Sequence, residues 1–243
     1  MRIAGIIAEY NPFHKGHAYH IGQTRLQTGA ESIICLMSGS FVQRGEPAFM
    51  DKFARTRAAL LSGADMVLEL PVIYSLQAAR YFALGGVRIF NGLSVLSILS
   101  FGREGQSLPN IREDALSRLK RGESYPSAVY DAALPNDVLA AEYIRGIEET
   151  GSDLEPFWIK RRGAHDSSGL DSALGIRRTA AAGEDITGAM PDGSAEVLKA
   201  QMALGRAPWQ EDVLFRLVCA RARALSAQAL ADAQDKLNQA QTA

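Results

Sequence analysis

The sequence has few cysteines, no excess charge of either sign and no long apolar run, and each shortage excludes a class of protein. Only Cys35 and Cys219 among 243 residues are cysteine, in no metal-binding spacing, which excludes a disulfide-stapled mini-protein and indicates a reducing compartment. The 26 Lys and Arg against 27 Asp and Glu give a net charge of −1, so the whole chain carries no basic signature for nucleic acid. Apolar stretches at 66–76 and 87–101 are interrupted by polar residues and fall short of the ~20 apolar residues that a membrane span needs. We therefore expect a cytoplasmic protein that binds no membrane.

Short apolar runs that end at turn residues predict buried strands in the first half of the chain. These runs cover residues 3–8, 32–37, 65–70 and 95–100. Helical periodicity fills the intervals at residues 17–27, 50–61 and 74–90. The alternation predicts an α/β fold, a Rossmann-like parallel sheet with helices on both faces, whose functional loops begin where the strands end.

The second half of the sequence is mainly helical in pattern. Helices are predicted at residues 111–120, 125–133 and 137–149, followed by a last strand at 156–160. From Ser172 onward the pattern is helical, and it ends in a segment at 226–243 rich in Ala and Gln. We expect a catalytic domain over residues 1–190 and a helical C-terminal segment over 191–243.

Three of the four histidines, His14, His17 and His20, follow the first predicted strand. His14 and His17 are spaced i and i+3 on the first turn of a helix, where backbone N–H groups and the helix dipole favour phosphate. Gly16 between them has no Cβ to obstruct close approach. Histidines that only cap and pack the helix are the ordinary alternative, but the clustering favours hydrogen bonding to charge that develops on a phosphoryl group. A zinc site is disfavoured because no Cys, Asp or HExxH partner completes a tetrahedral ligand set.

A resemblance to a known family becomes specific at these histidines. His14-Lys15-Gly16-His17 resembles the HxGH signature of the nucleotidylyltransferase superfamily, whose members bind ATP on a Rossmann-like sheet and release pyrophosphate as they form an adenylate. The longer strings at residues 9–17, 37–47 and 51–55 resemble the bacterial tRNA(Met) cytidine acetate ligase family, and the likeness covers most of residues 1–220.

The resemblance implies a reaction and its partners. Members of that family are understood to activate acetate with ATP to acetyl-adenylate, and then to acetylate the wobble cytidine of elongator tRNA(Met). The implied partners are therefore ATP, acetate and tRNA(Met). Mg²⁺ is expected with ATP, held largely by phosphate and water, so no dedicated protein metal site is predicted.

The resemblance also implies the site residues. His14 and His17, with Lys15, are the implied catalytic residues, stabilising the α-phosphate while acetate displaces pyrophosphate. The implied cofactor-binding positions of the nucleotide loop are Ile7, Ala8, Glu9, Tyr10, Asn11, Pro12, Phe13, Gly16 and His20. The implied positions farther along the chain are Gly102, Asn136 and Arg161, which match ATP contacts, and Ser172 and Arg177, which match a second phosphate-binding motif.

Several of these residues have an ordinary structural alternative. Gly102 reads equally as a turn glycine, Asn136 as a helix N-cap and Arg161 as a solvated charge. Ser172 can cap a helix and hold phosphate at once. The basic residues Arg44, Lys52 and Arg55 follow the second strand, and the sequence does not decide whether they neutralise pyrophosphate or contact tRNA.

The chain departs from the family pattern in three places, one of which is the loop at residues 162–166, shorter than the usual form. Arg103 stands before Glu104 where the family usually has a small residue, which alters the expected pocket for adenine or acetate. The helical region after residue 190 is short compared with the family, which weakens the expectation of tRNA binding. Two alternative functions stay open: a nucleotidylyltransferase that adenylylates another small substrate, and a non-catalytic nucleotide- or RNA-binding derivative.

Overall fold

The computed structural model describes residues 1–243 except 44, 106, 131–133, 161–171, 210 and 243. It divides into two units, Met1–Pro208 and Trp209–Ala243, which we describe separately.

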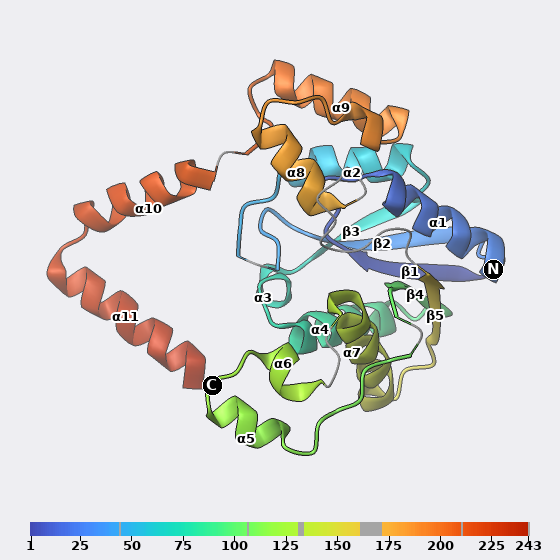
Figure 1. Ribbon diagram of the computed structural model, residues 1–243, viewed down its shortest axis with the longest axis horizontal. Helices are drawn as coiled ribbons and strands as arrows, with labels where there is room; N and C mark the ends of the chain where they lie inside the picture. The colour runs from blue at the N-terminus through green and yellow to red at the C-terminus, as the bar shows by residue number, and fades with distance from the viewer. Residues whose placement is uncertain (44, 106, 131–133, 161–171, 210, 243) are drawn as a thin grey trace. The chain divides into compact units, whose positions relative to one another are not determined.

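The first unit is built on a five-stranded sheet in which every pairing is parallel. Its strands are β1 (Ile3–Ala8), β2 (Ser32–Ser38), β3 (Met66–Leu70), β4 (Ile98–Arg103) and β5 (Glu155–Lys160). Their order is β3-β2-β1-β4-β5, so the chain reverses its direction of winding next to β1 (Figure 1). The predicted α/β fold with a parallel Rossmann-like sheet is confirmed, and the carboxyl ends of β1 and β4 meet at the point where such folds bind ligands.

Both faces of the sheet are apolar, as continuous hydrophobic strands predict. Along β2, Ile33 and Cys35 face one core while Ile34 and Leu36 face the other. The core that contains Ile33 is covered by α1 (Lys15–Thr28) and α2 (Lys52–Leu61). The opposite core is covered by α4 (Ala79–Leu93) and α7 (Pro135–Thr150).

Several predicted elements have different bounds in the structure; the predicted helix at 111–120, for example, begins only at Ala115. The predicted helix at 74–90 is two helices, α3 (Val72–Ser75) and α4, because Ala78 is extended (ψ 158°) and the Ser75 hydroxyl donates to the Phe41 carbonyl at 2.9 Å. The predicted strand at 95–100 begins at Ile98 and runs to Arg103, because its pairing with β5 continues from Ile98 to Arg103. Gly102 therefore lies within a strand and is not a turn residue.

Short helices complete the first unit. They are α5 (Ala115–Lys120), α6 (Tyr125–Val129), α8 (Ala173–Ala181), the 3₁₀ helix η1 (Thr187–Ala189) and α9 (Asp192–Ala203). A third core joins α9 to α2, with Leu198 and Met50 among its buried members. The compact unit consequently ends at Pro208, beyond the boundary expected at residue 190.

The second unit contains two helices, α10 (Glu211–Ala224) and α11 (Ala227–Thr242). Three large apolar side chains of α10, those of Phe215, Leu217 and Val218, are more than half exposed. In the described part of the chain, no helix combines the length and the apolar character needed to cross a membrane.

Candidate active site

A cavity of about 550 Å³ opens at the carboxyl ends of β1, β4 and β5. It is lined by most of the residues that the sequence predicts for nucleotide binding: Ile7, Ala8, Glu9, Tyr10, Asn11, His14, Gly16, His17, His20, Gly102, Asn136, Ser172 and Arg177. These residues come from segments more than 150 positions apart, so the fold brings the predicted site residues together. Their individual roles stay predictions.

His14 and His17 form a reciprocal cap at the start of α1. His14 is the N-cap residue, and its Nδ1 accepts a hydrogen bond from the Gly16 N–H at 3.0 Å. His17 Nδ1 accepts in turn from the His14 N–H at 3.2 Å. A neutral imidazole that accepts at Nδ1 carries its proton on Nε2, so both rings are fixed as Nε2–H donors. Capping and a catalytic role are therefore compatible, and the ordinary alternative does not compete with the functional one.

The two imidazole rings contact each other with their planes inclined by 31°, and the His17 ring also contacts aromatic side chains. The two imidazole centroids are 3.8 Å apart, and His14 is only 3% exposed. Tyr10 and Phe13 contact the His17 ring, with centroid distances of 4.9 and 5.4 Å. Because their neighbours are packed rings, both histidines are held in one orientation.

Tyr10, which contacts the His17 ring, is itself held in place by its backbone conformation and by Cys35. Its backbone is in the left-handed region (φ 48°), and its hydroxyl shares a 3.1 Å hydrogen bond with the Cys35 thiol. Burial raises the pKa of Tyr10 well above its usual value. Burial likewise raises the pKa of Cys35 to about 12, although the Tyr10 bond opposes the shift. Neither group is ionised near neutral pH, so this pair serves the site through its position.

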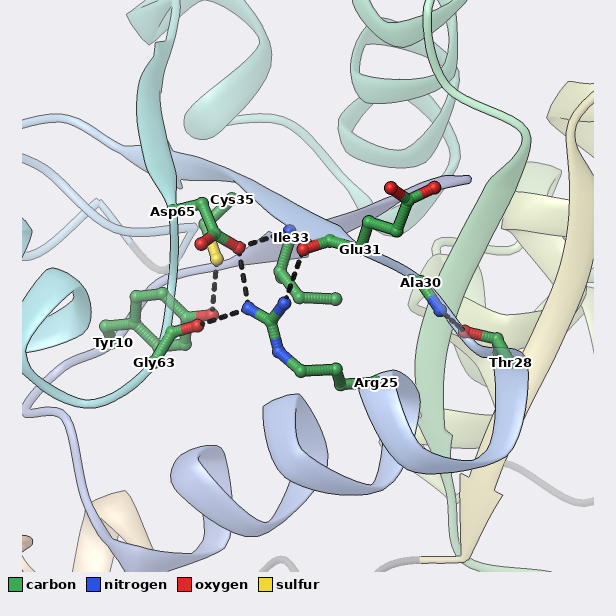
Figure 2. A network of polar contacts seen from close by, with 9 residues as sticks. All are labelled: Tyr10, Arg25, Thr28, Ala30, Glu31, Ile33, Cys35, Gly63 and Asp65. Atoms are coloured by element: carbon green, nitrogen blue, oxygen red, sulfur yellow. Dashed lines mark hydrogen bonds and ion pairs between the residues drawn. The ribbon is translucent and has the colours of Figure 1, made fainter. Parts of the chain in front are cut away.

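The other end of α1 is fastened to the neighbouring strands, as Figure 2 shows. Arg25 donates to the Glu31 carbonyl at 2.7 Å and to the Asp65 carboxylate at 2.6 Å. The same carboxylate accepts from the Ile33 N–H at 2.7 Å. Partial burial raises the pKa of Asp65, but these two donors outweigh it and leave the pKa below its ordinary value.

His20, one turn after His17, is held by hydroxyl groups. Its Nε2 lies 2.9 Å from the Ser100 hydroxyl, which lies 2.7 Å from the Thr24 hydroxyl. Ser100 is on β4, so this chain of contacts joins α1 to the middle of the sheet. The position of His20 in the cavity is thereby set.

Arg177 and Ser172 bring α8 to the nucleotide loop. The Arg177 guanidinium donates to the Asn11 carbonyl at 2.7 Å. Ser172 is the N-cap of α8 and accepts from the Gly175 N–H at 3.1 Å. Ser172 also lines the cavity, so the cap and the predicted phosphate contact occupy the same place.

Asn136 lies within the first turn of α7, whose N-cap is Leu134, so the alternative interpretation of Asn136 as a cap is wrong. Its side-chain amide donates to the Glu104 carboxylate. The sequence interpretation missed Asp137, which is 2% exposed and accepts from the N–H groups of Glu104 and Gly105 at 2.9 and 2.8 Å. An acidic residue in the first turn of a helix is a common sequence signal, but it does not reveal which loop the carboxylate holds.

Some predicted residues lie outside the cavity lining. Lys15 donates through Nζ to the Gly188 carbonyl at 2.8 Å, and neither Lys15, Pro12 nor Phe13 lines the cavity. Arg161, a predicted ATP contact, is outside the described residues.

Arg55 has a structural position that the sequence did not indicate. It is fully buried and donates to the carbonyls of Glu9, Ser38, Gly39 and Met50. Burial lowers its pKa to about 10, although nearby carboxylates oppose the shift. The role of Arg55, which the sequence left undecided, is in this structure a buried contact with four backbone carbonyls.

The other two basic residues after β2 differ from Arg55. Lys52 pairs with the Glu69 carboxylate at 2.6 Å, and Arg44 is outside the described residues. Within the part of the chain that the structure describes, no group of three His, Cys, Asp or Glu side chains could hold a metal ion.

Comparison with known proteins identifies relatives along nearly the whole chain. The family model for HIGH Nucleotidyl Transferase matches residues 1–239. The tRNA(Met) cytidine acetate ligase of Caldicellulosiruptor saccharolyticus is 39% identical over 252 residues, covering 91% of this chain and 63% of the relative. That of Syntrophomonas wolfei is 36% identical over 263 residues, covering 93% and 63%. The predicted resemblance to these ligases is confirmed, and the chain spans a little under two thirds of their length.

A solved structure is similar to most of this chain. The crystal structure of Thermotoga maritima TmcAL bound with alpha-thio ATP is 34% identical, with a TM-score of 0.76, and the match covers 86% of this chain and 57% of that one. An apo crystal form of the same protein gives a TM-score of 0.78 at 31% identity, covering 86% and 59%.

Proposed function

The chain belongs to the HIGH nucleotidyl transferase family, and from that membership we propose that it activates acetate with ATP and transfers the acetyl group to the wobble cytidine of elongator tRNA(Met). The names of the relatives and the ATP analogue bound by the Thermotoga protein support this proposal. All described cavity-lining residues precede Pro208, so we assign the activation step to the first unit and place it in the cytoplasm, where ATP and tRNA occur.

The observation that carries the proposal is the pair of imidazole Nε2–H donors at the N-terminus of α1, inside the cavity. In adenylate formation, a carboxylate oxygen attacks the α-phosphorus, the new O–P bond forms, and the bond to pyrophosphate breaks with its electron pair leaving on pyrophosphate. Negative charge on the equatorial oxygens is redistributed in the transition state. Two fixed donors and the positive end of the helix dipole stabilise that charge without rearrangement.

Other residues of the cavity have supporting roles in this proposal. Arg177 supplies positive charge beside the nucleotide loop, and Ser172 offers a hydroxyl and the N-terminus of α8 to phosphate. Lys160 also lines the cavity and adds positive charge at the end of β5. Mg²⁺ would accompany ATP, held largely by phosphate oxygens and water, as is usual for this ion with nucleotide phosphates.

The test is acetate-dependent exchange of labelled pyrophosphate into ATP, followed by mass spectrometry for acetylcytidine in tRNA(Met). We expect exchange with acetate and acetylcytidine in the product. Exchange with another carboxylate or a phosphorylated metabolite, and none with acetate, would identify a nucleotidylyltransferase of different specificity. ATP binding without exchange on any substrate would identify a non-catalytic derivative.

A further inference from the structure

One wall of the cavity is formed by residues that the sequence did not assign to nucleotide binding. We call it the loop wall; its members are Val42, Gln43 and Glu46 from the loop between β2 and α2, and residues 76–79 at the junction of α3 and α4. The same cavity is also lined by the imidazoles, Ser172 and Arg177. A cavity lined by groups of different chemistry suits two reactants.

The loop wall is held rigidly against the nucleotide loop. The Gln43 N–H donates to the Glu9 carboxylate at 2.8 Å, and the Gln43 side-chain amide donates to the Gln77 carbonyl at 3.2 Å. The loop is closed on itself, since the Val42 N–H donates to the Glu46 carbonyl at 3.0 Å. These bonds fix the wall before any substrate arrives.

The two ends of the same loop are held by buried hydrogen bonds. Arg55 donates to the carbonyls of Gly39 and Met50, which flank the loop. The Phe49 N–H donates to the Asn11 side-chain oxygen at 2.6 Å. The wall and the nucleotide loop are therefore positioned by common contacts, and a group bound to one is placed accurately relative to the other.

The acidic and basic lining residues come from different segments. Glu46 lies on the loop wall and Glu9 on the nucleotide loop that the wall contacts, whereas Lys160 and Arg177 come from β5 and α8 and are the basic residues of the described lining. Glu9 already accepts from Gln43. Within the described residues, the Glu46 carboxylate makes no hydrogen bond or ion pair, and it lines the cavity. It is thus the carboxylate available to a reactant that donates hydrogen bonds.

We propose that Glu46 receives the exocyclic amine of the acceptor base and takes its proton during acyl transfer. The assignment rests on the proposed function, because it concerns the second step of that reaction. A carboxylate is the usual acceptor for the N4 amine of cytosine, and an unstacked base inserted into a pocket exposes that edge. Val42 supplies an apolar surface beside it.

The amine nitrogen attacks the acetyl carbon of the adenylate, the N–C bond forms, and the bond from that carbon to the phosphate oxygen breaks with its electron pair leaving on AMP. One amine proton passes to Glu46 and from there to water. The amine of a nucleobase is a weak nucleophile, so a proton acceptor at this point accelerates the step, typically by roughly 10²–10⁴-fold.

The experiment compares the wild type with Glu46→Gln and with Glu196→Gln, a control at an exposed position of α9 away from the cavity. Three rates are measured: acetate-dependent pyrophosphate exchange, formation of acetyl hydroxamate with hydroxylamine, and formation of acetylcytidine in tRNA(Met). Hydroxylamine attacks an acyl adenylate without help from a base, so it reports the adenylate independently of Glu46. We expect E46Q to match the control within about twofold in the first two rates and to lose roughly 100-fold or more in the third.

Each other outcome overturns the assignment. If E46Q forms acetylcytidine at the wild-type rate, Glu46 is not the proton acceptor. If E46Q loses equally in all three rates, Glu46 acts in adenylate formation or in folding and not in acyl transfer. A wild type that forms hydroxamate but no acetylcytidine shows that the wall receives no base. Absence of pyrophosphate exchange in the wild type is distinguishable from all of these, because it refutes the proposed function itself.

Discussion

His17 is predicted to act on two sides of one ring, and two substitutions separate the actions. Its Nδ1 accepts from the His14 N–H and completes the cap, while its Nε2–H is the proposed donor to the α-phosphate. Asparagine places an amide oxygen near the position of Nδ1 and has nothing near Nε2. Alanine removes both groups. The variants His17→Asn and His17→Ala therefore divide structure from catalysis.

The expected magnitudes follow from these contacts. Loss of a capping acceptor costs about 1 kcal/mol of unfolding free energy, and some ring packing on Tyr10 and Phe13 is lost as well. Removal of one fixed donor from a charged transition state lowers kcat by roughly 10²–10³-fold. H17A should show both losses. H17N should retain the cap while losing a similar part of the activity.

The assays are urea denaturation followed by circular dichroism and acetate-dependent pyrophosphate exchange, performed on the same preparations. The reasoning is refuted if H17N exchanges pyrophosphate within about threefold of the wild-type rate, since Nε2–H would then supply little stabilisation. It is refuted equally if H17N and H17A lose the same stability, because the cap would not depend on an acceptor at this position.

Four further outcomes are expected elsewhere in the first unit and in α10. Arg55→Met removes the donor of four carbonyls, three of them buried, and should lower the free energy of unfolding measured in urea by roughly 3 kcal/mol or more; a loss below about 1 kcal/mol would contradict this structural role of Arg55. Because the pKa of Asp65 is lowered in the folded protein, its ionised carboxylate stabilises the fold at pH values above the ordinary aspartate pKa, and this stability is lost as the pH falls through the lowered pKa. The free energy of unfolding of Asp65→Asn should therefore depend less steeply on pH below about pH 4 than that of the wild type, and an unchanged slope would contradict this. Cys35, with its pKa raised to about 12, should resist a thiol reagent at pH 8 in the native protein while the less buried Cys219 reacts, and two equally fast thiols would be inconsistent with the burial. Ser172→Ala should cost about 1 kcal/mol in thermal unfolding and also weaken ATP binding measured by calorimetry, whereas a stability loss with unchanged affinity would leave Ser172 as a cap alone.

The parts of the fold that local patterns determine are those that the sequence predicted. Continuous apolar runs placed the first three strands within one residue of their observed bounds, because a strand buried on both faces needs no alternation. The histidine pair was predictable from its spacing, because an N-cap residue and the third residue of its helix meet in a reciprocal cap, as His14 and His17 do. The cavity followed from topology, because parallel strands place their loops at one edge of the sheet.

The parts that distant contacts determine were missed. The break between α3 and α4 depends on Ser75 reaching Phe41, and no local pattern records that contact. The extension of β4 to Arg103 depends on β5, which comes more than 50 residues later. An amphipathic pattern predicts that a segment is helical or extended, but its ends are set by partners elsewhere in the chain.

Arg55 shows why a charge in a motif is an ambiguous signal. An arginine after a strand in an ATP-binding fold fits a phosphate contact, and its five N–H donors are suited to that role. The same five donors also suit a place where the chain turns several times and leaves carbonyls pointing inward. The structure puts Arg55 at such a place, bonded to Glu9 at the end of β1 and to Ser38 and Gly39 at the end of β2. Unpaired buried carbonyls cost about 1–3 kcal/mol each, so satisfying three buried carbonyls and the partly buried one of Glu9 offsets the cost of burying one charge. The residue serves the site by holding two loops at a fixed separation, and that role depends on a convergence of backbone groups that no one-dimensional pattern contains.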